Sequence, residues 1–341
     1  MFVDVFVHLP FLLYIAEVSD KAVSSLSTIC VIGGTGFLGS HLLKSLESDR
    51  QLKVKVLSRK PTERFPQMTR GQIVEGDLLN ADSLSRFLEP GSVVVNLAYL
   101  ANHSREDNLH AAGYLAEACT KAGIRRLIHV STAVVAGRCR EDEVNEDTLC
   151  RPVTSYEKVK LEIERMLFNR LAGHCGVTVL RPTEIFGAGG AGLVHLATQV
   201  CQAAPIVRVK CAVFGRRRMH LIFVDNIAAA INFMAFADPS VDGECYVVSD
   251  DDADQNTYIG VVRVLADSFG IPNLPCNGLE LPRFVLAGIL RLAGRSDANP
   301  RRVYRCDKLL RTGFRKPIAF EEGIRRFADW FKNKYHAAMP A

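Results

Sequence analysis

A glycine-rich stretch near the N-terminus constrains the fold more than any other part of the chain. It reads Val-Ile-Gly-Gly-Thr-Gly-Phe-Leu-Gly-Ser over residues 31–40. Residues 27–32 have the pattern of a short buried strand, and after the glycines Leu38, Leu42 and Leu46 recur at helical spacing. The glycines are therefore expected at a turn from a strand into a helix.

Turns of this kind bind the phosphates of dinucleotides. The template G-x-G-x-x-G fits Gly34, Gly36 and Gly39, and a variant of it starts at Gly33. Residues without Cβ allow the tight bend, the approach of the backbone to a pyrophosphate, and close packing of helix on strand. The N-terminus of the helix adds free N–H groups and a partial positive charge. A plain surface turn is the alternative. The predicted cofactor contacts of this turn are Gly33, Thr35, Gly36, Phe37 and Leu38.

The residues after the second predicted strand, at 53–57, indicate which dinucleotide binds. Folds that prefer NAD carry an acidic residue there, which accepts a hydrogen bond from the ribose 2′-OH. This chain has Ser-Arg-Lys-Pro at 58–61 and no carboxylate, and Arg59 and Lys60 could pair with a 2′-phosphate. NADP(H) is therefore favoured. If both basic side chains point to solvent, NAD(H) remains possible.

An alternation of strands and helices follows, and it predicts an α/β fold with a Rossmann-type doubly wound parallel sheet. Asp77 and Leu78 follow the third strand, where a carboxylate could accept a hydrogen bond from the adenine amino group. Leu97 and Ala98 end the fourth, where the small Ala98 would leave room for a cofactor. Further strands are predicted at residues 72–75, 93–98, 126–131 and 177–181, and a helix at 107–122.

The candidate catalytic residues lie beyond the fifth strand. Ser131 and Thr132 end that strand, and ligands of such sheets bind at the carboxyl ends of strands. Tyr156 and Lys160 are four residues apart on a predicted helix, so they share one face. A nearby ammonium should lower the pKa of a tyrosine, which is about 10 when free. Tyr156 could then exchange a proton with a carbinol or ketone, whereas an ordinary exposed helical pair is the alternative.

These motifs together resemble the extended short-chain dehydrogenase/reductase family, also called NAD-dependent epimerase/dehydratase. The resemblance spans about residues 28–335. The segments that carry it are Gly33–Gly39, Gly76–Leu78, Asn96–Ala98, Val130–Ala133, Tyr156 with Lys160, Leu180–Thr183 and Phe223–Asn226.

The resemblance implies a role for each matching position. Tyr156 would be the acid/base, and Lys160 would also hold the nicotinamide ribose. Thr132 would bind the reacting oxygen, with Ser131 as the adjacent substitute, and Asn108 would support the site. The residues that would line the nicotinamide side are Arg181, Pro182 and Thr183.

The resemblance also implies a smaller C-terminal substrate-binding domain. The Rossmann domain would comprise residues 27–182 and about 221–249. The substrate-binding domain would comprise 183–220 and about 250–335. Members of the family often form homodimers, so the resemblance also implies a homodimer whose interface is made by the helices that carry Asn108 and Tyr156. Five apolar residues of this half of the chain are expected in the core rather than against substrate, namely Met219, Phe223, Leu281, Phe284 and Leu286.

Departures from the family pattern exclude some of the reactions that family members catalyse. Sugar-nucleotide 4,6-dehydratases of the family carry Asp-Glu after the active-site threonine, but Thr132 is followed by Ala133-Val134. The acid that eliminates water is therefore missing. Ala136-Gly137 replaces the Tyr-Gly of many epimerases and is closer to the hydroxysteroid dehydrogenase and dihydroflavonol reductase branches.

Three functions stay open on the sequence alone. The first is an NADP(H)-dependent oxidoreductase that interconverts a secondary alcohol and a ketone, with a nucleotide sugar as one candidate substrate. The second is a sugar-nucleotide epimerase, in which the loop 187–192 and the triplet 216–218 could hold a diphosphate. The third is a non-enzymatic NAD(P)-binding scaffold, against which the intact Tyr156 and Lys160 argue. No motif in residues 184–220 or 250–305 distinguishes sugars from steroids or smaller ketones.

Composition bears on location and partners. The net charge of +5 is modest and spread out, which argues against a nucleic-acid-binding face. Ten scattered cysteines without metal-ligand spacing favour reduced thiols in the cytoplasm and no metal site. Residues 1–26 form an extension, of which 1–16 are mostly apolar yet too short for a membrane span. A weak membrane-surface anchor is an alternative for this segment.

Overall fold

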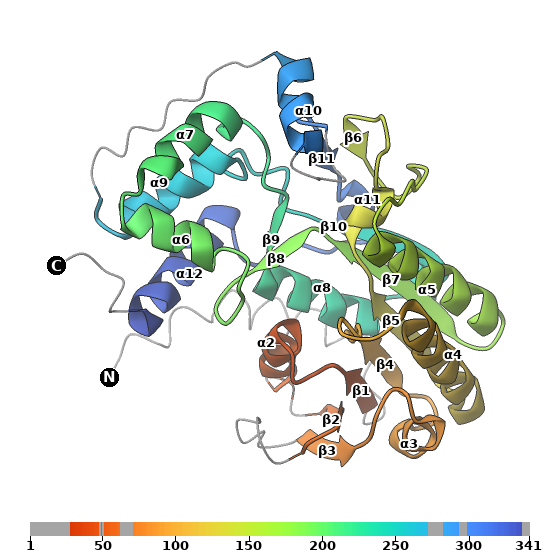
Figure 1. The fold of residues 1–341 in the computed structure, drawn as a ribbon. Coiled ribbons are helices and arrows are strands. Elements are labelled where there is room, and N and C mark those ends of the chain that lie inside the picture. The colour runs from red at the N-terminus through yellow and green to blue at the C-terminus, as the bar shows by residue number, and fades with distance from the viewer. Residues whose placement is uncertain are drawn as a thin grey trace.

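A seven-stranded parallel sheet organises the computed structural model, which describes residues 28–47, 49, 51–61, 71–271, 282–292 and 299–335 (Figure 1). The strand order is β10-β7-β5-β4-β1-β2-β3, and every pairing is parallel. This is the doubly wound α/β arrangement predicted from the sequence. The strands are β1 (Thr28–Ile32), β2 (Lys53–Ser58), β3 (Gly71–Glu75), β4 (Val93–Asn96), β5 (Arg126–Val130), β7 (Gly176–Pro182) and β10 (Glu244–Val248).

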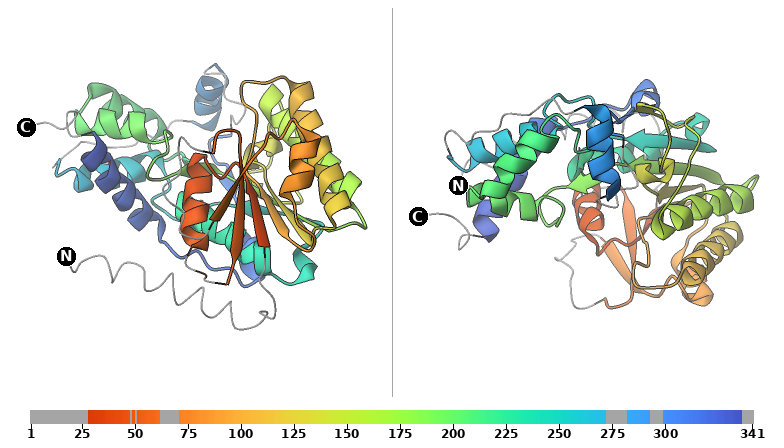
Figure 2. Two further views of the ribbon diagram at one scale, coloured as in Figure 1. Left: turned by 90° about the horizontal axis from the view of Figure 1, so that it is seen from below. Right: turned by 45° about the horizontal axis from the view of Figure 1, so that its top comes forward.

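Helices cover both faces of this sheet, as the two views of Figure 2 show. On one face lie α2 (Phe37–Leu46) and α8 (Val224–Phe236), and on the other α3 (Ala81–Phe87), α4 (Arg105–Ala122) and α5 (Ser155–Leu171). Strand β4 consists of Val93, Val94, Val95 and Asn96, and all four are buried. Such continuous burial is expected of a parallel strand with helices on both sides.

A smaller unit lies beside the sheet, at the upper left of Figure 1. Its helices α6, α7, α9 and α12 share an apolar core in which Phe186, Phe327 and Phe331 are buried. The elements are β8 (Glu184–Phe186), α6 (Val194–Cys201), α7 (Pro205–Phe214), β9 (Leu221–Phe223), α9 (Tyr258–Ser268), α10 (Arg283–Leu292) and α12 (Phe320–Lys334). Short elements complete the described chain: η1 (Ala133–Ala136), β6 (Glu143–Val144), η2 (Pro239–Val241), β11 (Val303–Tyr304) and α11 (Asp307–Arg311).

Two expectations about this half of the chain are wrong. Strand β9 pairs with β8 in a separate two-stranded sheet, so the return to the large sheet begins only at Val224. Phe284 is 78% exposed rather than in the core, because the buried side of α10 is formed around Leu290. Leu281 and the N-terminal extension lie outside the described residues. The two-domain division of the chain remains a prediction.

Strand β10 forms one edge of the large sheet, and its polar groups are partly covered. The amide of Val247 donates a hydrogen bond of 2.7 Å to Glu146 Oε1, which approaches from the β6 side of the chain. Lys308 on α11 pairs with Glu244 and lies over the Tyr246 ring. Side chains therefore occupy part of an edge that would otherwise offer free backbone groups.

No helix among the described residues is long and apolar enough to cross a bilayer. They contain no group of three or more His, Cys, Asp or Glu side chains placed to hold a metal ion. No disulfide bond joins any two of the nine cysteines in the described part of the chain.

Candidate active site

The glycine turn joins β1 to α2 as the sequence predicts. Gly33 has a φ of +82°, in the left-handed region that favours glycine. A Cβ on Gly39 would lie 2.4 Å from the carbonyl oxygen of Gly33 and 2.5 Å from that of Gly34. Only glycine therefore lets the first turn of α2 pack this closely on the end of β1.

The N-terminus of α2 differs from those of the two other helices near the site. Helices α4 and α5 begin with complete capping boxes, at Ser104 with Asp107 and at Thr154 with Glu157. By contrast, the N-cap of α2 is Gly36, and no described side chain caps it. Its first N–H groups are therefore available to an anion. This cradle fits the pyrophosphate of a dinucleotide.

The segment after β4 closes the cradle from the side. A Cβ on Gly33 would lie 3.1 Å from the Ala98 amide nitrogen, so the two backbone segments are in contact. Asn96 Oδ1 accepts a hydrogen bond of 3.1 Å from that amide. Asn108 fixes the following loop, since its side chain bonds to both backbone groups of Leu100. Asn108 is buried, which suits a supporting rather than a reacting role.

The other predicted cofactor contacts lie at the ends of β2 and β3. Arg59 and Lys60 are exposed directly after β2. Asp77 is half-buried and accepts a hydrogen bond of 2.9 Å from the Leu79 amide, while Leu78 is buried. Arg59 and Lys60 follow the carboxyl end of β2, which neighbours β1 in the sheet, whereas Asp77 and Leu78 follow that of β3, one strand further out.

Thr132 and Tyr156 meet at the end of β5. Thr132 precedes η1, and its hydroxyl accepts a hydrogen bond of 3.4 Å from the Val134 amide. A hydrogen bond between Thr132 and Tyr156 lowers the pKa of Tyr156, but partial burial of this residue, which is 40% exposed, has the larger effect, so the pKa is raised above its usual value. The expected lowering is therefore absent from this structure. Ser131 is buried, and its hydroxyl has no partner among the described residues.

Lys160 follows Tyr156 by about one turn of α5 and is almost completely buried. Its ammonium donates a hydrogen bond of 3.1 Å to the carbonyl oxygen of Val130. It also lies 5.2 Å from the ring centroid of Tyr99, whose ring meets that of Tyr156 edge-on at 4.9 Å. Burial lowers the pKa of Lys160 to about 8. The ammonium thus faces a carbonyl and Tyr99, which explains why it does not offset the effect of burial on Tyr156.

Sequence reasoning did not identify Tyr99. Its only signal was its place three residues after Asn96, where the fourth strand ends. In the structure it is the residue that lies between the acid/base candidate and the lysine.

Arg181 is placed differently from the other nicotinamide-side candidates. Its guanidinium Nη2 lies 2.6 Å from Glu164 Oε2, and both side chains are buried. Glu164 is one turn beyond Lys160, so this pair fastens α5 to β7. Pro182 and Thr183 continue the strand, and the Thr183 amide donates to the Val248 carbonyl. Glu164 was also missed, because one carboxylate on an amphipathic helix carries no special sequence signal.

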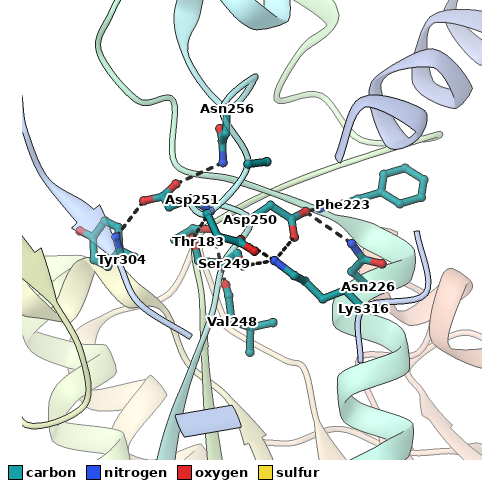
Figure 3. A network of polar contacts seen from close by, with 12 residues as sticks. Thr183, Phe223, Asn226, Val248, Ser249, Asp250, Asp251, Asn256, Tyr304 and Lys316 are labelled. Atoms are coloured by element: carbon teal, nitrogen blue, oxygen red, sulfur yellow. Dashed lines mark hydrogen bonds and ion pairs between the residues drawn. The ribbon is translucent and has the colours of Figure 1, made fainter. Parts of the chain in front are cut away.

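A buried polar network joins the end of β10 to the smaller unit (Figure 3). Asp250 lies 3.0 Å from the Lys316 ammonium and accepts a hydrogen bond from the Phe223 amide. Asp251 accepts hydrogen bonds from the Tyr304 amide at 2.8 Å and the Asn256 side chain at 3.1 Å. Burial raises the pKa of Asp250. The network fixes how β9, α8 and the segment before α12 meet the sheet.

His41 links the glycine turn to the loop 187–192, which sequence reasoning considered for a diphosphate. One ring nitrogen lies 2.7 Å from Asp225 Oδ1, and the other lies 2.8 Å from the carbonyl oxygen of Ala188. A Cβ on Gly190 would lie 2.7 Å from the Phe37 ring. The loop therefore rests directly on the first turn of α2.

Known proteins that are similar to this chain include two 4-epimerases and a 4,6-dehydratase. A UDP-glucose 4-epimerase from Azospirillum brasilense is 32% identical over 215 residues, 57% of this chain and 59% of the relative. A dTDP-D-glucose 4,6-dehydratase from Mus musculus is 20% identical over 335 residues, 90% of this chain and 89% of the relative.

A third relative, from Escherichia coli O157:H7, is an N-acetyl-alpha-D-glucosaminyl-diphospho-ditrans,octacis-undecaprenol 4-epimerase. It is 26% identical over 218 residues, 60% of this chain and 62% of the relative. The chain thus matches about three fifths of the length of the two 4-epimerases, 59% and 62%.

Solved structures share the fold. The Thermus thermophilus UDP-glucose 4-epimerase, in complex with NAD, superposes with a TM-score of 0.67 at 23% identity, covering 89% of this chain and 99% of that chain. A UDP-N-acetylglucosamine 4-epimerase from Methanobrevibacter ruminantium gives 0.70 at 21% identity, covering 91% and 100%. At such identities the likeness concerns the fold.

The model of the NAD dependent epimerase/dehydratase family matches residues 29–249, well over half of the chain. The match begins at β1 and ends just after β10, so it contains the glycine turn, Thr132, Tyr156 and Lys160. The chain therefore belongs to the NAD dependent epimerase/dehydratase family.

Proposed function

We propose that this protein is a nucleotide-sugar epimerase that retains a nicotinamide dinucleotide. The observation that carries the proposal is the meeting of Tyr156 and Thr132 at the sheet edge that also holds the glycine turn. A bound nicotinamide dinucleotide supplies reversible hydride transfer. The phenol of Tyr156 would exchange a proton with the sugar hydroxyl, and Thr132 would orient that oxygen.

Two further observations favour epimerisation over elimination of water. The residues after Thr132 are Ala133 and Val134, which cannot protonate a leaving hydroxyl. The two curated relatives that act as 4-epimerases are more similar to this chain, at 32% and 26% identity, than the 4,6-dehydratase at 20%. At least four of the solved structures with this fold hold NAD, which supports NAD as the retained cofactor.

The test is the inversion of a sugar carbon without net consumption of cofactor. UDP-glucose, UDP-galactose and their N-acetylated forms are incubated with the protein, and the products are followed by proton NMR together with the absorbance of reduced nicotinamide. We expect interconversion at C4 with no net change in reduced nicotinamide. Tyr156→Phe should lower turnover by at least about 100-fold, the lower end of what general acid–base catalysis contributes. Tyr114→Phe, an exposed tyrosine on α4, is the matched control and should leave turnover unchanged.

An NADP(H)-dependent oxidoreductase is the second candidate, and one observation favours it. No carboxylate stands at positions 58–61, and Arg59 is exposed directly after β2, from where it could pair with a 2′-phosphate. Titration of the protein with NADPH and NADH, followed by nicotinamide fluorescence, separates the two functions. Tighter binding of NADPH that Ser58→Asp with Arg59→Ala reverses, together with release of oxidised or reduced product, would replace the epimerase proposal.

A further inference from the structure

Exposed apolar side chains are concentrated on two helices of the smaller unit. Among the described residues, eight large apolar side chains are exposed, and five of these belong to α7 and α10. Val209 is 57% exposed, Phe284 78% and Leu292 92%. Single exposed apolar residues need no explanation, but a local group of them marks an interaction site.

The two helices stand next to each other at one end of the molecule. Figure 1 shows α7 and α10 as neighbours at the upper end of the smaller unit, away from α4 and α5. Both views of Figure 2 keep the two helices at the same end of the molecule, so this is not an effect of one projection. We call their exposed apolar residues, Ile206, Val209, Phe284, Val285 and Leu292, the α7–α10 surface.

Each of the two helices packs against the protein with the face opposite its exposed apolar residues. On α7, Val207 and Cys211 are fully buried, whereas Ile206 and Val209 face outward. On α10, Leu290 is 4% exposed, whereas Phe284 and Leu292 face outward. The outward side chains thus add nothing to the core, and burying them against a partner would be favourable.

The charged residues in the two sequence segments that contain these helices are all basic. Residues 185–224, which contain α7, include five Lys and Arg residues and no Asp or Glu. Residues 281–296, which contain α10, also lack acidic residues. Arg208 on α7 and Arg291 on α10 are exposed. Two segments that combine exposed apolar side chains with arginines, and that contain no carboxylate of their own, have the composition of a surface that lies on anionic lipid headgroups.

We propose that the α7–α10 surface docks the protein on an anionic lipid bilayer. Phe284, Leu292 and Val209 would enter the boundary between headgroups and acyl chains. Arg208 and Arg291 would pair with lipid phosphates. The contact is peripheral. It uses none of the residues assigned to the candidate active site, such as Tyr156.

Co-sedimentation of the full chain with vesicles tests this proposal. We expect binding to phosphatidylcholine vesicles that contain phosphatidylglycerol, and much weaker binding to pure phosphatidylcholine. Phe284→Glu should weaken binding about tenfold or more, because burial of an apolar side chain is lost. Arg208→Glu and Arg291→Glu should each weaken it about fivefold or more.

Two matched controls carry the same chemical changes elsewhere. Leu149→Glu alters an apolar side chain that is 66% exposed, and Arg311→Glu alters an exposed arginine on α11. Both should bind vesicles like the unmodified protein. Far-UV circular dichroism and nicotinamide binding of every variant verify that the fold is kept.

Three outcomes would overturn the proposal. One is that the unmodified protein ignores anionic vesicles. Another is that Phe284→Glu binds them as well as Leu149→Glu does, which would assign the contact to another segment, such as the apolar residues 1–16. The third is that Phe284→Glu changes the oligomeric state in the absence of vesicles, measured by light scattering. The surface would then join copies of the chain.

Discussion

Loss of the Glu164 carboxylate should destabilise this protein more than loss of any exposed carboxylate. Glu164 is 1% exposed and Arg181 9%, and the guanidinium makes three contacts with the carboxylate at 3.2, 3.2 and 2.6 Å. Glu164→Leu leaves the guanidinium buried without a counter-charge. Breaking a buried pair in this way costs about 3–5 kcal/mol.

Urea unfolding followed by far-UV circular dichroism measures this cost. The control is Glu321→Gln, which breaks an exposed pair with Arg325 on α12 and should cost only about 0.3–0.5 kcal/mol. The double variant Glu164→Leu with Arg181→Leu removes both charges, and most of the lost stability should return. If Glu164→Leu lies within about 1 kcal/mol of the unmodified protein, the argument from desolvation is refuted.

Two further predictions concern the turn and the buried lysine. Gly39→Ala should abolish dinucleotide binding in a fluorescence titration, because its Cβ would lie 2.4 Å from a carbonyl oxygen; retained affinity would mean that the turn can open. The pKa of Lys160 falls from 10.5 in the unfolded chain to about 8 in the folded protein. Below pH 8 the lysine is charged in both states, and its burial lowers the free energy of unfolding. This destabilisation disappears as the pH rises from 8 toward 10.5, because the folded protein then holds the lysine neutral. Lys160→Met should therefore stabilise the ligand-free protein at pH 7, by up to about 3 kcal/mol, and by less at pH 10. Urea unfolding at the two pH values checks this, and a gain that did not shrink with pH would contradict it.

The sheet and the glycine turn were predictable because their signals are local. The glycines, the continuous apolar run of β4, and the four-residue spacing of Tyr156 and Lys160 each follow from backbone geometry. What the sequence could not supply was the partner of each polar side chain. Arg181 looked like a cofactor contact, but its guanidinium is held by Glu164.

Two errors have the same origin in tertiary structure. Leu221–Phe223 has the composition of a sheet strand, and only the position of Glu184–Phe186 decides which sheet it joins. Phe284 has the composition of a core residue, and only the neighbours of α10 determine that it faces outward. The pKa of Tyr156 likewise depends on where the Lys160 ammonium points, which residue spacing does not reveal.

The covered edge of the large sheet has a consequence for how this protein behaves at high concentration. An open edge strand can recruit a strand from another copy, and growth of a sheet through such contacts is a common route to aggregation. Here the Val247 amide is already bonded to Glu146, and α11 is fastened beside it through Lys308. Copies of this chain are thereby discouraged from joining through this part of β10, which gives the Glu146 carboxylate a role in solubility.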